Sequence, residues 1–347
     1  MRLRGPHKWK KPRAPFWRFR GGFASVGVDF SPCMKRREFL LTTAGGLAAG
    51  FLPGTSLFGQ TASPSPSPAV TPAPAPLVPE FKAIRGNVGW FTCRGGTIGS
   101  LVNGDGVMAV DAQFPDCAKL FLADLPDRKG RKFDVLINSH HHGDHTSGNK
   151  VFQPETKMIV SQENVPALQK AAALLNNNEA DQVYAGTLFA KEWKTNLGDE
   201  VIRTTYFGPG HTNGDCIIHF EKADVVHLGD LMFNRIYPAI DRRGGASIKN
   251  WIVTLGTVSK MFGKDTVFIF GHAKKEAGVT GNAADLIVLR DYLTALLDYT
   301  RQGMKDGKTK EQLMTLEEMP GFPDFRAPKP NRLANNVDVA FEELSAG

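Results

Sequence analysis

Four apolar segments of this chain are each followed by histidine or aspartate residues that stand beside a glycine. The segments are residues 133–138, 201–207, 225–228 and 267–270, and the polar groups after them are residues 140–145, His211, Asp230 and His272. Short runs rich in Val, Ile and Phe predict buried β-strands. Because sites are usually built where strands end, we expect these polar groups to meet at one edge of a sheet. The fold must therefore bring together four strand ends that are distant in sequence.

The first polar group is the densest and reads H-x-H-x-D-H. His140 and His142, two residues apart on one turn, would converge on one metal ion, while Asp144 and His145 would face a second. Imidazole nitrogen and carboxylate oxygen suit Zn²⁺. A low-complexity histidine tract is not favoured, because glycine, aspartate and asparagine are interleaved with the histidines.

The rest of the sequence alternates between strand-like and helix-like segments. Further strands are expected at residues 88–92, 98–102, 107–111, 157–161 and 216–220, and helices at 117–125, 164–175, 283–299 and 333–344. This order predicts a layered α/β or α+β domain.

Four motifs occur in a fixed order over most of residues 84–345. They are H-x-H-x-D-H, the sequence G-P-G-H-T at residues 208–212, a following Gly-Asp and a final Gly-His. In this order they resemble the metallo-β-lactamase superfamily. The resemblance implies an α/β fold of four layers, an αββα sandwich in which two mixed sheets lie face to face between helices, with a metal site at one edge.

The resemblance also implies seven ligands for two zinc ions per chain. The ligands of the first ion would be His140, His142 and His211. Those of the second would be Asp144, His145 and His272, with Asp230 bridging the two ions. Asp111, at the end of its strand, resembles the buried structural aspartate of the family and is not expected to be a ligand.

These ligands imply a metal-dependent hydrolase. Two cations would bridge a water, lower its pKa towards neutrality and present hydroxide as the nucleophile. Asp144 is the expected catalytic residue, because it would orient that nucleophile and shuttle its proton. The bond broken would be an ester, lactone, thioester, β-lactam or related bond in a small-molecule substrate. True β-lactamases typically have Cys or Ser at the position of Asp230, whereas Asp is typical of thioesterase, lactonase and phosphodiesterase-like members.

Two other functions fit the same motifs. Persulfide dioxygenases have a similar motif with a single iron ion, so an iron-dependent persulfide or sulfur oxidoreductase is one alternative. Flavodiiron oxygen reductases are disfavoured, because they replace with Glu the histidine that is retained here as His142. The other alternative is a non-enzymatic metal-binding accessory protein, although such proteins usually lose ligands.

Several residues near the motifs are expected to have other roles. His219 and His227 are predicted to pack within strands, and His141 to point away from the metals. The segments Leu174–Trp193 and Met232–Trp251 are longer than plain connections need. In the superfamily that the chain resembles, such inserts overhang the metals and select substrates.

The positive charge of the chain lies before this domain. The whole chain has a formal net charge of +7, and residues 1–33 account for all of it with eight basic residues and one acidic residue. Residues 34–62 contain Arg36 and Arg37 followed by a short apolar run, which resembles a twin-arginine export signal and is too short for a stable membrane span. We interpret residues 1–33 as an upstream extension or basic leader. Residues 63–80, with Pro alternating with Ser and Ala, are expected to form an extended linker to a hydrolase domain at 81–347.

The charge balance of the remaining chain argues against nucleic-acid binding. Without residues 1–62 the chain has 31 basic and 33 acidic residues. The expected partners are therefore a small-molecule substrate and, during export to the periplasm, the twin-arginine translocation machinery. Three cysteines remain, an odd number that argues against a complete disulfide framework and leaves a Cys93–Cys117 bridge as an alternative.

Overall fold

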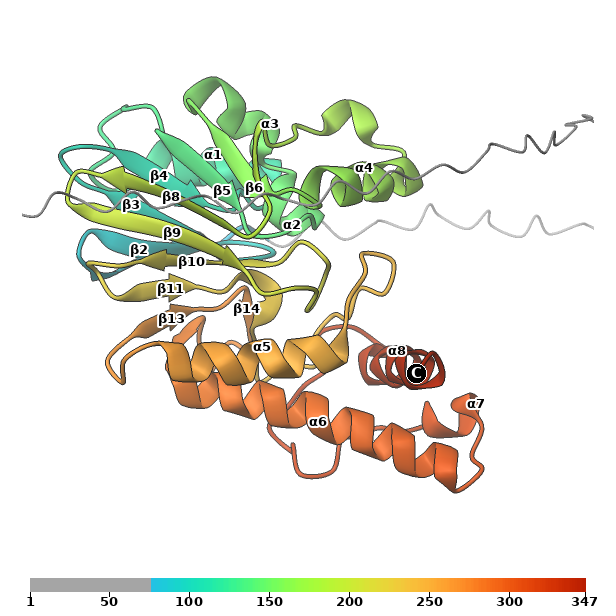
Figure 1. Ribbon diagram of the computed structural model, residues 1–347. Coiled ribbons are helices and arrows are strands. Elements are labelled where there is room, and N and C mark those ends of the chain that lie inside the picture. Colours follow the sequence, from blue (N-terminus) through green and yellow to red (C-terminus); the bar gives the residue numbers. More distant parts are fainter. Residues whose placement is uncertain (1–75) are drawn as a thin grey trace, which may run out of the picture. The chain divides into compact units, whose positions relative to one another are not determined.

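The computed structural model describes residues 76–347. The predicted leader at residues 1–33 and export signal at residues 34–62 lie outside the described residues, as does most of the predicted linker at 63–80. The described residues form an α/β fold with two large β-sheets and helices on their outer faces (Figure 1).

The first sheet has seven strands, in spatial order β1 to β7. They are β1 (Glu80–Arg85), β2 (Val88–Thr92), β3 (Ile98–Val102), β4 (Val107–Val110), β5 (Val135–Asn138), β6 (Ile159–Gln162) and β7 (Thr187–Phe189). Strands β1 to β4 form an antiparallel meander, and β4 to β7 pair in parallel. The parallel half contains β5, which leads directly into the H-x-H-x-D-H motif.

The second sheet has six strands in the order β15-β13-β11-β10-β9-β8. They are β8 (Glu192–Leu197), β9 (Glu200–Tyr206), β10 (Cys216–Phe220), β11 (Val225–His227), β13 (Val267–Ile269) and β15 (Thr280–Gly281). Strands β8 to β11 are antiparallel, and β13 pairs in parallel with β11. A two-stranded parallel ribbon joins β12 (Phe233–Asn234) to β14 (His272–Ala273).

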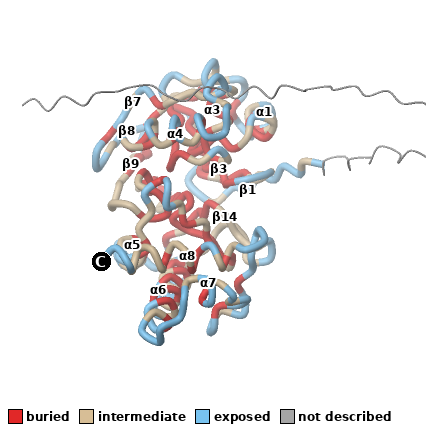
Figure 2. The backbone as a smooth tube through the Cα atoms, turned by 90° about the vertical axis from the view of Figure 1, so that its right-hand side faces the viewer, coloured by how far each residue is buried: buried red, intermediate tan, exposed pale blue. Residues whose placement is uncertain are grey.

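The two sheets face each other across a common apolar core. Its fully buried side chains come from both sheets and include Leu101, Met108 and Ile137 of the first and Ile218 and Ile269 of the second. In Figure 2 buried residues run through the centre of the fold and along α6, whereas the edge strand β1 and the outer loops are mostly exposed. Apolar burial of this kind is the main favourable term in folding, so the contact between the sheets sets their relative placement.

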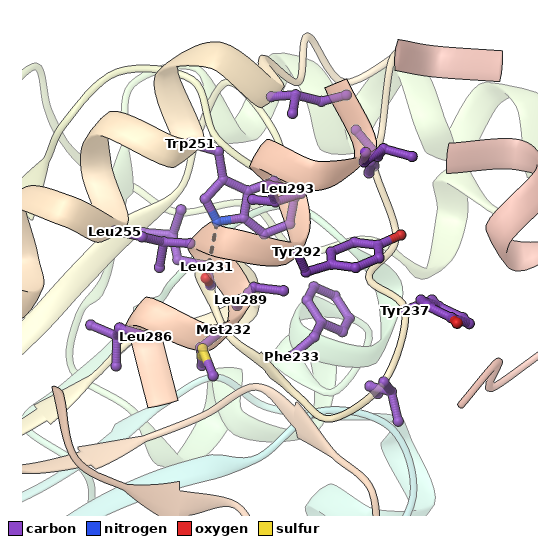
Figure 3. Packing of buried hydrophobic residues seen from close by; sticks show 14 of the residues in the cluster. Leu231, Met232, Phe233, Tyr237, Trp251, Leu255, Leu286, Leu289, Tyr292 and Leu293 are labelled. Carbon is purple, nitrogen blue, oxygen red and sulfur yellow. Dashed lines mark hydrogen bonds between the residues drawn. The ribbon is translucent and has the colours of Figure 1, made fainter. Parts of the chain in front are cut away.

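Helices cover the outer face of each sheet. On the first sheet, α1 (Pro115–Asp124) and α3 (Asn149–Phe152) bury Phe121 and Phe152 beside Phe133. On the second sheet, α5 (Ile248–Met261) and α6 (Ala283–Lys305) pack a larger cluster (Figure 3). The other helices are α2 (Gly143–Thr146), α4 (Val165–Asn176), α7 (Lys310–Leu313) and α8 (Arg332–Ser345). The order helix, sheet, sheet, helix confirms the predicted αββα sandwich.

The sequence of α5 explains both its start and its orientation. The side chain of Ser247 accepts a hydrogen bond from the backbone N–H of Asn250 at 3.2 Å, which satisfies a donor that the first turn would leave unpaired. Its buried residues recur at helical spacing and form one apolar face: Ile248, Trp251, Leu255 and Val258. None of the helices between residues 76 and 347 is both long and apolar enough to cross a membrane.

All the predicted strands and helices are present, with ends shifted by a few residues, but several short elements and three longer ones, β1, β8 and α5, were not predicted. Strands β1 and β8 lie at sheet edges and mix polar with apolar residues, and α5 begins inside the segment interpreted as an insert. The interpretation of Leu174–Trp193 as an insert needs correction. That segment contains the last turn of α4, all of β7 and the start of β8, because short edge strands carry little apolar signal.

We predict that Trp251→Ala lowers the free energy of unfolding by about 3–5 kcal/mol, because Trp251 is fully buried and its indole N–H donates to the Leu231 carbonyl at 3.0 Å. Thermal and denaturant unfolding measure the change. The matched control is Val253→Ala, since Val253 lies on the same helix with 63% of its surface exposed. Equal stability of the two variants would contradict this account of the outer core.

Candidate metal centre

The four polar groups meet where their strands end. His140, His142, Asp144 and His145 follow β5, and the last two lie in the short helix α2. His211 lies in the loop between β9 and β10. Asp230 lies in a 3-10 turn after β11, and His272 begins β14 just after β13. The structure thus places all seven predicted ligands close together.

Four of these residues form a first donor group. The donor atoms of His140, His142, His211 and Asp230 all lie within 4.8 Å of one another. His211 Nε2 is 2.9 Å from His142 Nδ1 and 3.5 Å from Asp230 Oδ2, and His140 Nε2 is 3.8 Å from Asp230 Oδ2. Two donors on one tetrahedral zinc ion lie about 3.3 Å apart. The three histidines and the aspartate therefore fit one ion.

Asp144, His145 and His272 form a second donor group, whose donor atoms also lie within 4.8 Å of one another. His272 Nε2 lies 3.2 Å from Asp144 Oδ2 and 3.3 Å from Asp230 Oδ2. His145 Nε2 lies 3.0 Å from Asp230 Oδ1. Asp230 thus touches both groups, and its two carboxylate oxygens offer a donor to each. This arrangement agrees with the bridging role that the resemblance implies for Asp230.

Unpartnered buried atoms test whether this donor set fits metal ions. His140 Nε2, His145 Nε2 and Asp230 Oδ1 are buried and form no hydrogen bond within residues 76–347, although the last two lie 3.0 Å apart. Buried polar atoms nearly always have a partner, and leaving one unpaired costs about 1–3 kcal/mol. Three such atoms turned towards one another are explained by cations bound between them.

The other ring nitrogen of four histidines has a partner outside the donor groups. His140 Nδ1 lies 3.1 Å from Ser139 Oγ, and His211 Nδ1 lies 2.7 Å from the Ala239 carbonyl. His145 Nδ1 and His142 Nε2 each lie 2.8 Å from an aspartate, Asp111 and Asp241 respectively. Such contacts set the tautomer and the ring orientation of metal-binding histidines.

Asp111 has the structural role that the resemblance implies. It is fully buried at the end of β4, and its backbone has a φ of +66°, a conformation that aspartate adopts more readily than most residues. Its Oδ1 accepts the N–H of Ser139 and its Oδ2 accepts the hydroxyl of the same residue, both at 2.7 Å. Asp111 therefore connects the start of the first motif to the ring of His145.

Asp241 is the site residue that sequence reasoning missed. It lies in the segment 232–251 and contacts both His142 and His141, whose Nε2 is 3.3 Å from Asp241 Oδ2. His141 lies outside both groups of predicted ligands, but it is buried, and its donor atom lies within 4.8 Å of those of His142 and Asp241 in a third group that could hold a metal ion. No pattern in the sequence connects Asp241 to a histidine 99 positions away.

Burial and neighbouring charges divide the histidines into two classes. Burial lowers the pKa of His140 well below its usual value and lowers that of His211 to about 3, so both are neutral, which is the form that binds metal. For His272, burial is outweighed by the Asp230 and Asp144 carboxylates, which raise its pKa to about 9. The pKa of Asp230 is held well below its usual value by the surrounding histidines, despite burial.

Two glycines allow the backbone to approach the site. A Cβ added at Gly96 would stand 2.3 Å from His145 Cε1, and one at Gly271 would stand 2.1 Å from Asp230 Oδ1. Any side chain at either position would displace a residue of the donor groups. The close contact therefore explains why glycine precedes the final histidine and why the β2–β3 loop is glycine-rich.

The two histidines predicted to pack within strands do so. His227 is fully buried on β11, and its Nε2 lies 3.1 Å from the Thr97 carbonyl. His219 lies on β10, with its ring 4.7 Å from that of Phe262. Neither residue belongs to a donor group.

Comparison with known proteins finds one family that is similar to this part of the chain. The family described as "Metallo-beta-lactamase superfamily" matches residues 109–272. These residues are similar to that superfamily, and the chain has its fold. No curated protein matches this chain significantly.

Solved structures show the same fold. The stereoselective inverting sec-alkylsulfatase Pisa1 from Pseudomonas sp. is 13% identical, with a TM-score of 0.58 over 76% of this chain. This chain spans only 50% of that protein's length. The metallo-β-lactamase from Pontibacter korlensis is 16% identical, with a TM-score of 0.52 over 62% of this chain and 99% of its own. The DIM-1 metallo-β-lactamase is also 16% identical, with a TM-score of 0.52 over 63% and 99%.

We predict that Asp241→Ala lowers the affinity for zinc by about 10–100-fold, because the ring of His142 loses the carboxylate that orients it. Competition with a chelator of known zinc affinity measures the change. Asp241→Asn retains an oxygen acceptor and is expected to lose less.

The matched control is Asp199→Ala. Asp199 is an exposed aspartate in the turn between β8 and β9, and it belongs to neither donor group. An Asp241→Ala variant that binds zinc as tightly as the unmodified chain would show that His142 does not need this contact.

Proposed function

We propose that this chain is a dinuclear zinc hydrolase that acts on a small-molecule substrate. The observation that carries the proposal is the shared position of Asp230 between two compact donor groups whose inward atoms are buried and unpartnered. The similarity of residues 109–272 to the superfamily supports hydrolysis as the reaction class. The donors are imidazoles and carboxylates without a thiolate, which suits zinc.

His140, His142 and His211 would hold the first ion, Asp144, His145 and His272 the second, and Asp230 both. Bound zinc would supply Lewis acidity and lower the pKa of water towards neutrality. Four of the seven residues, His140, His145, His211 and Asp230, expose at most 3% of their side chains. They form the closed floor of the site.

The open side of the site is formed by His142, Asp144 and His272. Their side chains are 24%, 26% and 21% exposed, so a substrate would reach the centre past them. The pKa of Asp144 is lowered, against the effect of burial, by His145 and His272. Asp144 is therefore an ionised acceptor at the entrance. We assign to it the orientation of the attacking water and the acceptance of its proton.

Carbonyl esters, lactones, thioesters and β-lactams are the candidate substrates. An aspartate at position 230 rather than Cys or Ser favours the first three over dedicated β-lactam hydrolysis. Similarity to a sec-alkylsulfatase adds sulfate esters to the candidates that a substrate panel should include.

We predict that His211→Ala abolishes hydrolysis of any substrate that the chain accepts and lowers metal content below two ions per chain. The reason is that His211 is fully buried and supplies Nε2 to the first donor group. Elemental analysis of the purified protein and a panel of ester, lactone, thioester, β-lactam and sulfate-ester substrates measure both effects. The control is His219→Ala, which removes a histidine outside the donor groups.

The proposal is supported if the unmodified chain contains zinc and if hydrolysis is lost in His211→Ala but retained in His219→Ala. Iron as the bound metal together with oxygen-dependent turnover of a persulfide would contradict it, and so would full activity of metal-free His211→Ala.

We also propose that the chain is exported to the periplasm by the twin-arginine machinery, because residues 34–62 have the arginine pair and short apolar run of such a signal. The double change Arg36→Lys and Arg37→Lys is predicted to retain the protein in the cytoplasm, measured by cell fractionation. The control is Arg18→Lys with Arg20→Lys, which changes two arginines upstream of the signal. Unchanged export of the Arg36/Arg37 variant would refute this route.

A further inference from the structure

Two cysteine sulfurs lie next to each other where the loop after β2 meets α1. Cys93 Sγ is 2.7 Å from Cys117 Sγ, and the two residues are 24 positions apart. Cys93 directly follows β2 and is partly exposed, whereas Cys117 lies in the first half of α1 and is fully buried. A disulfide has an S–S length of about 2.05 Å, so only a small movement separates these sulfurs from a bond.

The neighbouring residues hold the same two segments together. Arg94 donates to both carboxylate oxygens of Asp116, at 3.0 and 2.8 Å. Its guanidinium also lies 4.7 Å from the centre of the Phe114 ring. Two charged hydrogen bonds and a cation–π contact thus place the loop after β2 on the start of α1. The two sulfurs are brought together by contacts that do not involve them.

This loop forms one wall of the second donor group. The N–H of Gly96 donates to the Asp144 carbonyl at 3.3 Å, and the side-chain amide of Gln113 donates to the Gly96 carbonyl. A Cβ at Gly95 would stand 2.7 Å from Asp144 Cβ. Movement of the loop would therefore change the packing around Asp144 and His145.

We propose that Cys93 and Cys117 form a disulfide that fastens the β2–β3 loop to α1 behind the second donor group. The reaction is a thiol–disulfide exchange with a small disulfide such as oxidised glutathione. Cys93, the accessible thiol, loses its proton and attacks one sulfur of the oxidant, which releases one thiol and leaves a mixed disulfide. Cys117 then loses its proton and attacks Cys93, which releases the second thiol. The two cysteines are oxidised by two electrons, and the oxidant is reduced to two thiols.

The third cysteine of the domain takes no part. Cys216 is fully buried on β10, and its sulfur contacts the Asn138 carbonyl at 3.8 Å. The proposed bond involves none of the seven predicted metal ligands, so its formation can be tested apart from the proposed hydrolysis. A loop of this length, once closed, restricts the unfolded chain and stabilises the fold.

Tryptic digestion tests the bond directly, because cleavage after Arg94 separates the two cysteines into peptides 86–94 and 95–119. The full chain is incubated with oxidised glutathione, alkylated and digested without reductant. We expect the two peptides to be recovered as a linked pair that reductant separates. Unlinked peptides, with Cys93 alkylated or carrying glutathione, would overturn the proposal.

Stability and hydrogen exchange test the role of the bond. We expect the melting temperature of the oxidised chain to exceed that of the reduced chain by about 5–10 °C. Exchange of the Gly96 amide should slow on oxidation, because the loop no longer opens as readily. Cys93→Ser should remove both redox-dependent differences, whereas Cys216→Ala and Cys33→Ser should retain them. If the disulfide forms but the melting temperature and the exchange of the Gly96 amide stay unchanged, the bond does not hold the β2–β3 loop to α1.

Discussion

The buried carboxylate of Asp230 is the group on which the rest of the site depends. Its Oδ1 faces His145, and its Oδ2 lies 3.3, 3.5 and 3.8 Å from nitrogens of His272, His211 and His140. An ionised carboxylate that is only 3% exposed is costly unless cations surround it. The protein meets this requirement with histidines from three other strand ends, and the Asp230 carboxylate raises the pKa of His272 and His145 in return. Two bound cations would take the place of protons on these rings, compensate the carboxylate and explain why inward atoms of the site have no partner.

A layer of contacts around the donors prepares the histidines for this role. Asp111, Asp241, Ser139 and the Ala239 carbonyl each contact one ring nitrogen, which leaves the other nitrogen turned inward. Burial adds to this effect, because it keeps His140 and His211 neutral. Orientation is therefore determined by residues of the fold, so the donors need little rearrangement to bind metal.

Much of the fold and of the donor set could be predicted from the sequence, for a physical reason. Buried strands appear in the sequence as apolar runs. A histidine or aspartate that follows such a run beside a glycine is therefore easy to recognise, as at His211, Asp230 and His272. The edge strands β1 and β8 carry no comparable signal, because half of each is exposed and polar. Asp241 carries none either: its role arises only when the loop before α5 folds over His142. The pairing of Cys93 with Cys117 likewise depends on how the β2–β3 loop meets α1.

The central claim is that two donor groups sharing Asp230 each bind a zinc ion. Anomalous X-ray diffraction at the zinc absorption edge tests this claim most directly, because it locates the metal independently of any assay. We expect two anomalous peaks, one among His140, His142 and His211 and one among Asp144, His145 and His272, with the Asp230 carboxylate between them. No peak at either position in crystals of zinc-loaded protein, or a single peak outside both groups, would contradict it.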